Sequence, residues 1–170
     1  MTNELMIIMA HKPIECVRIA NGEQPIIARK TIPKQFEPPY RVLMYCNKEK
    51  AKSKRLCKNC FGKSCCYISY QQHSCDTILN SKVIGEYVVD KTKEVGITTV
   101  EGEVNLCFGN TRIVHYCHIT EVKIYDEPKD IWDYNHIVKG HKKLSGKQTY
   151  VQCRITTAPK NFVYVEEQSE

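Results

Sequence analysis

The chain has 170 residues, of which 42% are hydrophobic, and it carries a formal net charge of +6. This length and composition predict a single globular domain, residues 1–170, that is large enough to bury its own core. No apolar run approaches the roughly 18 residues that cross a bilayer, and the first four residues lack the cationic start of a signal peptide. We therefore expect a cytoplasmic protein without a membrane span.

The first predicted unit is a strand, a helix and a second strand. Leu5–Met9 is a compact apolar strand. Lys12-Pro13 opens the helix, because proline is tolerated in a first turn, and Asn21-Gly22 closes it in the left-handed conformation that suits these residues. Pro25–Ala28 reads as a buried strand, and it brings three cations to one end of the unit: Arg29, Lys30 and Lys34.

Four later segments also have strand patterns. They are Arg41–Cys46, which follows the breaker Glu37-Pro38-Pro39, then Val83–Val89, Arg112–Tyr125 and Phe162–Glu166. Arg112–Tyr125 is one long strand or a bent pair, and Glu127-Pro128 is expected to end it. Lys139–Lys147 is polar and contains glycine, which is typical of a mobile loop. Several strands with one helix near the start predict an α+β protein built on a small mixed β-barrel.

Residues 47–80 show no clear period, and we expect them to form a basic, cysteine-rich insertion that protrudes from the barrel. Between Asn47 and Cys66 seven basic residues face one acidic residue, which equals the net charge of the whole chain. Such a run is either a solvated loop or a surface that contacts a polyanion. The cations that we expect to contact phosphates here are Lys50, Lys52, Lys54 and Arg55.

Five of the ten cysteines lie in the same insertion, and the others are scattered among apolar residues. In a cytoplasmic protein this distribution favours inert core thiols at Cys16, Cys46, Cys107, Cys117 and Cys153, and either bound metal or free surface thiols in the insertion. The ligand count permits one structural, tetrahedral Zn²⁺. The first choice of ligands is Cys57, Cys60, Cys65 and Cys75, with Cys66 and His73 as substitutes. Nearby aromatic side chains could stack on bases: Phe61, Tyr67 and Tyr70.

The opening unit, LMIIMAHKPIECVRIANGEQPIIARK, resembles the start of ASCH domains, small relatives of the PUA barrel that meet RNA and nucleotides. Three later segments extend the resemblance to the phage and bacterial members of the family: Lys82–Tyr87, His118–Lys129 and Ala158–Glu167. The resemblance implies a PUA-like fold with a cleft beside the first helix. We expect this cleft to contain Lys12, Arg29, Lys30, Glu86, His118 and Tyr164.

The chain departs from the family's motif at its reactive positions. The motif is a glycine, then a lysine, a glutamate or threonine, and an arginine; Gly22 and Arg29 match, but Gln24 replaces the lysine and Ile27 the glutamate or threonine. In ASCH enzymes that hydrolyse N4-acetylcytidine, the lysine, the threonine and a later glutamate are the catalytic groups. Glutamine has no titrating proton and isoleucine no nucleophile. Arg29 could bind a phosphate, or it could form a structural pair with Glu86.

Three functions remain open. The first is a non-catalytic protein, phage-borne by resemblance, that binds RNA, DNA or a nucleotide through Lys12, Arg29, Lys30 and Lys34 and through the basic insertion. The second is an anti-CRISPR-like inhibitor of a host defence nucleoprotein complex. The third is a hydrolase of a modified nucleobase or RNA with reassigned groups, Glu86 and His118. His118 on an alternating strand is equally compatible with a half-buried structural histidine.

Overall fold

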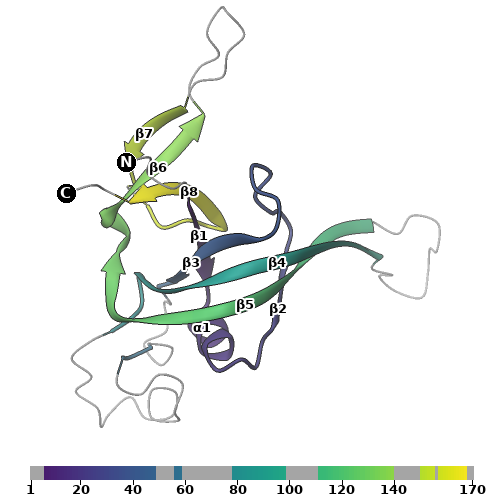
Figure 1. The fold of residues 1–170 in the computed structure, drawn as a ribbon, viewed down its shortest axis with the longest axis horizontal. Helices are drawn as coiled ribbons and strands as arrows, with labels where there is room; N and C mark the ends of the chain where they lie inside the picture. The colour runs from purple at the N-terminus through teal and green to yellow at the C-terminus, as the bar shows by residue number, and fades with distance from the viewer. Residues whose placement is uncertain are drawn as a thin grey trace, which may run out of the picture.

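The computed structural model describes residues 6–48, 56–58, 78–98, 111–139, 150–155 and 157–167. In chain order the elements are β1 (Met6–His11), α1 (Pro13–Ala20), β2 (Ile26–Arg29), β3 (Tyr40–Cys46), β4 (Lys82–Thr98), β5 (Thr111–Asp130), the short 3₁₀ helix η2 (Ile131–Asp133), β6 (Tyr134–Lys139), β7 (Tyr150–Arg154) and β8 (Phe162–Glu167) (Figure 1). Within these residues no helix is long and apolar enough to cross a membrane.

The helix α1 begins and ends as its sequence predicts. The Glu15 carboxylate accepts a hydrogen bond of 3.0 Å from the Lys12 backbone N–H, which satisfies one free donor of the first turn. At the other end the Gly22 N–H bonds to the Ile19 carbonyl and the Glu23 N–H to the Arg18 carbonyl, a Schellman motif. Gly22 alone takes the left-handed conformation, at φ 73°, whereas Asn21 stays right-handed.

The eight strands form one mixed sheet in the order β2-β5-β4-β3-β1-β8-β6-β7. β1 and β3 are parallel, joined by a crossover that contains α1, and the other neighbouring strands are antiparallel. The predicted mixed strand directions are confirmed. The predicted closed barrel is not found, because among the described residues no pairing joins β2 to β7, the two ends of the sheet.

Apolar clusters cover both faces of the central strands. On the face toward α1, Cys16, Val17 and Ile19 of the helix pack against alternate residues of the sheet, such as Ile27 and Cys117. On the opposite face, η2, the start of β6 and Ile155 cover the other alternate residues, including Ile8, Leu43 and Val165. Strand alternation therefore assigns each apolar residue of β1 and β3 to one of two cores.

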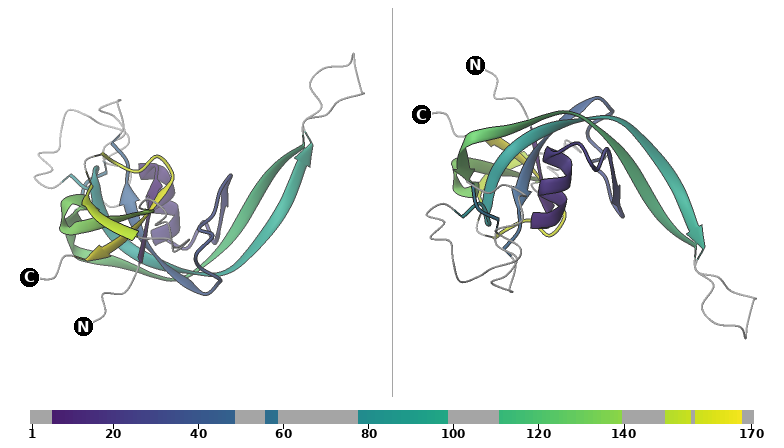
Figure 2. Two further views of the ribbon diagram at one scale, coloured as in Figure 1. Left: turned by 90° about the horizontal axis from the view of Figure 1, so that it is seen from above. Right: turned by 90° about the horizontal axis from the view of Figure 1, so that it is seen from below.

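β4 and β5 extend beyond the core as an arm, which we define as residues 90–98 and 111–118. At its base β2 pairs with residues 115–118, and Cys117 is buried in the core. The arm is an antiparallel ladder that runs from Lys91 opposite His118 to Thr98 opposite Thr111. Figure 2 shows both strands curving, with α1 on the inner side of the curve. The sequence prediction of β4 was too short, since it ended at Val89.

The sequence prediction that Glu127-Pro128 ends β5 was also wrong, because the strand continues to Asp130. The ladder with β4 passes from Ile124, opposite Gly85, to Lys129, opposite Val83. Pro128 falls in the irregular stretch between these pairs. Its missing N–H therefore breaks no ladder hydrogen bond.

The two ends of the predicted insertion are fixed to the core. Leu56 and Leu79 are buried in the cluster beneath α1. The Leu79 N–H donates to the Leu56 carbonyl at 2.8 Å, and the Asn80 side chain accepts from the Leu56 N–H and donates to the Asn47 carbonyl. Most of the insertion, residues 59–77, lies outside the described residues.

Candidate functional site

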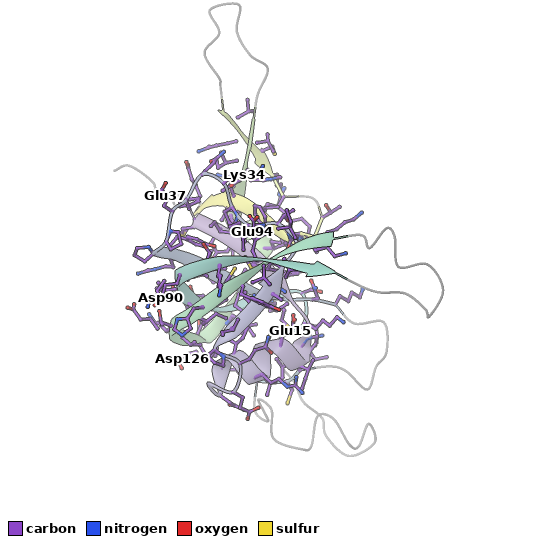
Figure 3. All side chains as sticks on the ribbon, turned by 90° about the vertical axis from the view of Figure 1, so that its right-hand side faces the viewer. Glu15, Lys34, Glu37, Asp90, Glu94 and Asp126 are labelled. Carbon is purple, nitrogen blue, oxygen red and sulfur yellow. The ribbon has the colours of Figure 1, made fainter. Side chains whose placement is uncertain are left out.

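A pocket of about 630 Å³ lies between the segment that follows β2 and the inner face of the arm. In Figure 3, which looks along the arm, Lys34 and Glu37 lie on this segment and Glu94 on the arm. The lining side chains are Lys30, Thr31, Ile32, Pro33, Lys34, Phe36, Glu37 and Pro38 from the segment, and Thr92, Glu94, Ile113 and His115 from the arm. The pocket includes two of the cations that the sequence selected, Lys30 and Lys34.

The segment 30–38 is held in place by contacts to β8. The Phe36 ring stacks on Tyr164 with centroids 5.8 Å apart and an interplanar angle of 21°. The Gln35 N–H donates to the Tyr164 hydroxyl at 3.4 Å, and the Asn161 amide donates to the Thr31 carbonyl at 3.4 Å. These contacts make one wall of the pocket preformed, with Phe36 as its aromatic member.

The charges in the pocket come from both walls. Lys30 and Lys34 are exposed, and Glu37 and Glu94 are exposed on the segment and the arm. His115 Nδ1 lies 3.9 Å from the Glu94 carboxylate. The pocket thus combines an apolar wall with ammonium groups and a histidine–carboxylate pair. The two lysines and the two glutamates of the lining balance in formal charge, so the pocket joins an apolar wall to polar groups of both signs.

Arg29 lies next to the pocket but points into a separate polar cluster beneath α1. Its Nη2 is 2.9 Å from His11 Nδ1 and 3.3 Å from the Ala10 carbonyl, its Nε contacts Met9 Sδ at 3.4 Å, and its Nη1 lies 3.8 Å from the Glu15 carboxylate. Its side chain is 13% exposed. All three guanidinium nitrogens therefore have protein partners, which gives Arg29 a structural role.

The cluster fixes the tautomer of His11, which is fully buried. Arginine can only donate, so His11 Nδ1 accepts from Arg29, and Nε2–H donates to the Tyr87 hydroxyl at 2.9 Å. The Tyr87 hydroxyl then donates to Met9 Sδ at 3.4 Å. Glu15 lies 3.7 Å from His11 Nδ1, farther away than the Arg29 Nη2 atom at 2.9 Å.

The same cluster shifts three titrating groups. Burial lowers the pKa of His11 below its ordinary value of 6.5, and the charge of Arg29 acts in the same direction. His11, the Lys12 backbone N–H and Arg29 hold the pKa of Glu15 at about 2. Burial raises the pKa of Tyr87 well above 10.0. The cluster is therefore an Arg29–Glu15 ion pair joined to a neutral histidine and a neutral tyrosine.

The predicted pair of Arg29 with Glu86 is wrong, because the two residues lie on opposite faces of the sheet. Glu86 is paired with Leu43, away from α1. Its carboxylate lies 3.7 Å from Arg41 and accepts a hydrogen bond of 2.8 Å from the Tyr125 hydroxyl. Arg29 instead takes Glu15 as its acidic partner.

The structure separates the two groups that a hydrolase would have to combine. His118 Nδ1 lies 2.6 Å from the Asp90 carboxylate, so its interpretation as a half-buried structural histidine fits the geometry. Glu86 is opposite Lys123, five residues along β5 from His118. At about 3.4 Å per residue this spacing is roughly 17 Å, too far for both side chains to act on one bond.

Some of the remaining predicted site residues lie within the described ranges, and the others lie outside them. Lys12 is exposed at the start of α1, and Cys57 is buried and pairs with Ile78 in an isolated bridge. Lys50, Lys52, Lys54, Arg55, Cys60, Cys65 and Cys75 lie outside the described residues, as do Cys66 and His73, most of Lys139–Lys147, and Phe61, Tyr67 and Tyr70. Within the described ranges no group of three or more ligand side chains could hold a metal ion.

The scattered cysteines are mostly as expected. Cys16, Cys46 and Cys117 are buried thiols, whereas Cys153 is exposed on β7, so its assignment to the core was wrong. Among the described strands β7 pairs with β6 alone and forms one end of the sheet, and residues 151–154 are exposed. Cys107 lies outside the described residues.

Sequence reasoning missed Phe36, Glu94, Ile113 and His115 as members of the pocket. Glu94, Ile113 and His115 belong to the arm, and only the register between its strands brings them together. The aromatic Phe36 between two proline-containing turns was the one local signal available.

No protein-family model and no curated protein matches this sequence. Among solved structures, the chain is similar to a crystal structure of ASCH from Zymomonas mobilis, with 11% identity, coverage of 74% of this chain and 73% of that chain, and a TM-score of 0.43. A mutant of the same Zymomonas mobilis protein gives 10% identity, coverage of 74% and 75%, and a TM-score of 0.43.

Proposed function

We propose that this chain is a non-catalytic nucleic-acid or nucleotide binding protein whose pocket takes a base and its phosphate. The observation that supports the proposal is the pocket itself, where the ammonium groups of Lys30 and Lys34 border an apolar wall that contains Phe36. A base can lie against the apolar wall while the lysines contact a phosphate. The sequence resemblance to ASCH domains of the phage and bacterial type supports the same class of ligand.

The two replaced motif positions support binding without turnover. Ile27 is fully buried and packs in the core beneath α1, so its position has become part of the core rather than of an open cleft. Gln24 cannot act as a general base. We expect no hydrolysis of N4-acetylcytidine above background. Rapid turnover by the unmodified protein, lost in Glu86→Gln, would make the chain a hydrolase instead.

Fluorescence anisotropy with labelled single-stranded RNA and DNA of about 12 nucleotides tests the binding proposal. We expect binding at about 50 mM salt and a loss of roughly tenfold in affinity when Lys30→Ala and Lys34→Ala are combined. Arg18→Ala is the matched control. Arg18 is an exposed cation on α1, and no residue of α1 lines the pocket, so this substitution should leave the affinity unchanged.

Mononucleotides titrated by calorimetry supply the second arm of the test. Binding of a mononucleotide that is lost in the double lysine variant would identify a nucleotide as the ligand. Absence of binding to RNA, DNA and nucleotides at low salt would contradict the proposal. If the protein bound none of these ligands but formed a stable complex with a host defence nucleoprotein, its function would be that of an inhibitor instead.

A further inference from the structure

The outer face of the arm, turned away from α1, carries a set of exposed side chains that the pocket does not use. Opposite residues of an antiparallel ladder share a face. Glu94 and His115 are opposite each other and line the pocket on the inner face, so the alternating pairs of the ladder lie on the outer face. These pairs are Val95 with Val114, Lys93 with Tyr116 and Lys91 with His118; β2 adds Ile26 beside His118 and Ala28 beside Tyr116.

Two rings on this face are accessible from solvent. Tyr116 is 37% exposed, and the His118 side chain is 43% exposed. They alternate along β5 two residues apart, which separates their Cα atoms by about 7 Å. Ile26, which is 50% exposed, adds apolar surface next to His118. The face therefore presents two ring side chains in a row on a sheet, where neighbouring bases of a single strand can stack.

The charge beside the rings is positive. Lys91 and Lys93 are exposed on β4, next to the two rings, and among the described residues neither has an acidic partner within 4 Å. The nearest acid, Asp90, occupies the irregular position in the ladder before Lys91, and it is already bonded to His118 at 2.6 Å. Contact with His118 lowers the pKa of Asp90. The two lysines remain available for an anion.

We propose that the outer face of the arm binds single-stranded nucleic acid, with bases stacked on Tyr116 and His118 and phosphates beside Lys91 and Lys93. This inference rests on the proposed function and adds a second contact surface to it. The backbone phosphates complement the unpaired lysines, and the rings offer a stacking surface that every base can use. An acidic peptide would use the lysines but leave the two rings without partners.

The test uses the full chain and a labelled oligonucleotide of about 12 uridines, measured by anisotropy. Tyr116→Ala should weaken binding by roughly tenfold or more, and Tyr116→Phe, which keeps the ring, should bind as the unmodified protein does. Lys91→Ala with Lys93→Ala should reduce the slope of log affinity against log salt by about 1.4, two phosphates at about 0.7 each. Arg18→Ala, which removes an exposed cation of α1 outside both the pocket and the arm, is the matched control and should not change this slope.

Photocrosslinking with 4-thiouridine in the same oligonucleotide gives an independent readout. The proposal expects crosslinks in the peptide that contains Tyr116 and His118. Suppose that binding depends on Lys30 and Lys34 but is unchanged by Tyr116→Ala and by the combined Lys91→Ala and Lys93→Ala substitutions. This result would overturn the inference about the arm and leave the proposed function intact. No binding to the oligonucleotide at low salt would also overturn this inference, and the proposed function would be overturned with it only if DNA and mononucleotides failed to bind as well.

Discussion

At the scale of single residues, the clearest result is that the partner of a buried charge is chosen by topology. Arg29 was expected to reach a phosphate or Glu86, and it binds Glu15 and His11 instead. His11 ends β1 directly before α1 begins, and the pairing of β2 with β5 holds Arg29 within hydrogen-bond distance of it. A largely buried guanidinium group needs an acceptor near each of its nitrogen donors, and the residues around Arg29 supply these acceptors.

The cluster makes stability depend on pH. Because the pKa of His11 is lowered in the folded chain, its contribution is complete above pH 6.5 and is lost as the pH falls toward the folded value. Glu15 adds a second loss as the pH falls from its ordinary pKa of 4.5 toward about 2. We expect the free energy of unfolding, measured by urea denaturation, to fall continuously from pH 7 to pH 4.

His11→Gln tests the assignment. The variant should be about 1–3 kcal/mol less stable at pH 7, because a buried donor or acceptor of the cluster loses its partner. Its stability should change less between pH 6.5 and pH 5 than that of the unmodified protein. Burial also lowers the pKa of His136, so His11→Gln with His136→Gln should be the flattest. If the slope of the unfolding free energy against pH were the same in both variants as in the unmodified protein, His11 would not be the cause of the pH dependence.

At the scale of elements, local signals predicted what local interactions decide. Pro13 and Gly22 set the ends of α1, and β1, β3 and β8 are found within one or two residues of their apolar runs. The arm was not predicted in full, because Lys91–Thr98 alternates charged, small and β-branched residues without an apolar face of its own. Pairing with β5, rather than an apolar pattern of its own, keeps this segment in a strand.

β6 and β7 were missed for a related reason. β6 contains Asn135 and His136, and β7 contains Gln152 and Arg154, so neither segment has a long apolar run. β6 pairs with both β7 and β8, and this neighbourhood rather than intrinsic preference makes it a strand. In the candidate site, likewise, the cations could be predicted from sequence, while the pocket they border depends on the register of the arm.

Alanine substitutions at two glycines test how closely β4 is packed against β5. A Cβ at Gly85 would collide with the Lys123 carbonyl oxygen and lie 3.1 Å from Ile124 Cα, both backbone atoms of β5 that cannot move aside cheaply. Gly85→Ala should therefore cost about 3 kcal/mol. Gly22→Ala meets no atom within 4 Å and bears only the cost of its positive φ, about 1 kcal/mol. Equal losses in urea denaturation would show that β4 and β5 separate easily at this point.

We also propose that the cysteine-rich insertion binds zinc through Cys57, Cys60, Cys65 and Cys75. Purified protein should then carry close to one zinc per chain by elemental analysis. Cys60→Ser should lose the metal, whereas Cys153→Ser, on the exposed face of β7, should retain it. Purified protein that carries no metal and in which Cys60, Cys65 and Cys75 all react readily with a thiol reagent would contradict the proposal.

At the scale of the whole molecule, the charge is divided between places with different expected roles. The segment between Asn47 and Cys66 accounts for the entire net charge, and the pocket and the arm add only a few cations each. If the segment follows a phosphate backbone, removing Lys50, Lys52, Lys54 and Arg55 together should flatten the salt dependence of binding by roughly three units. An unchanged slope in anisotropy measurements would limit nucleic-acid contact to the pocket and the arm.

The position of β1 in the sheet has a consequence for how the chain reaches its native state. β1 lies between β3 and β8, and Met6 is opposite Val165. The edge of β1 that pairs with β8 thus stays open until residues 162–167 have been synthesised. Contacts this distant in sequence are slow to form. Until β8 arrives, the hydrogen-bonding edge of an apolar strand is available to other chains, so newly made protein depends on prompt completion, or on a chaperone, to avoid aggregation.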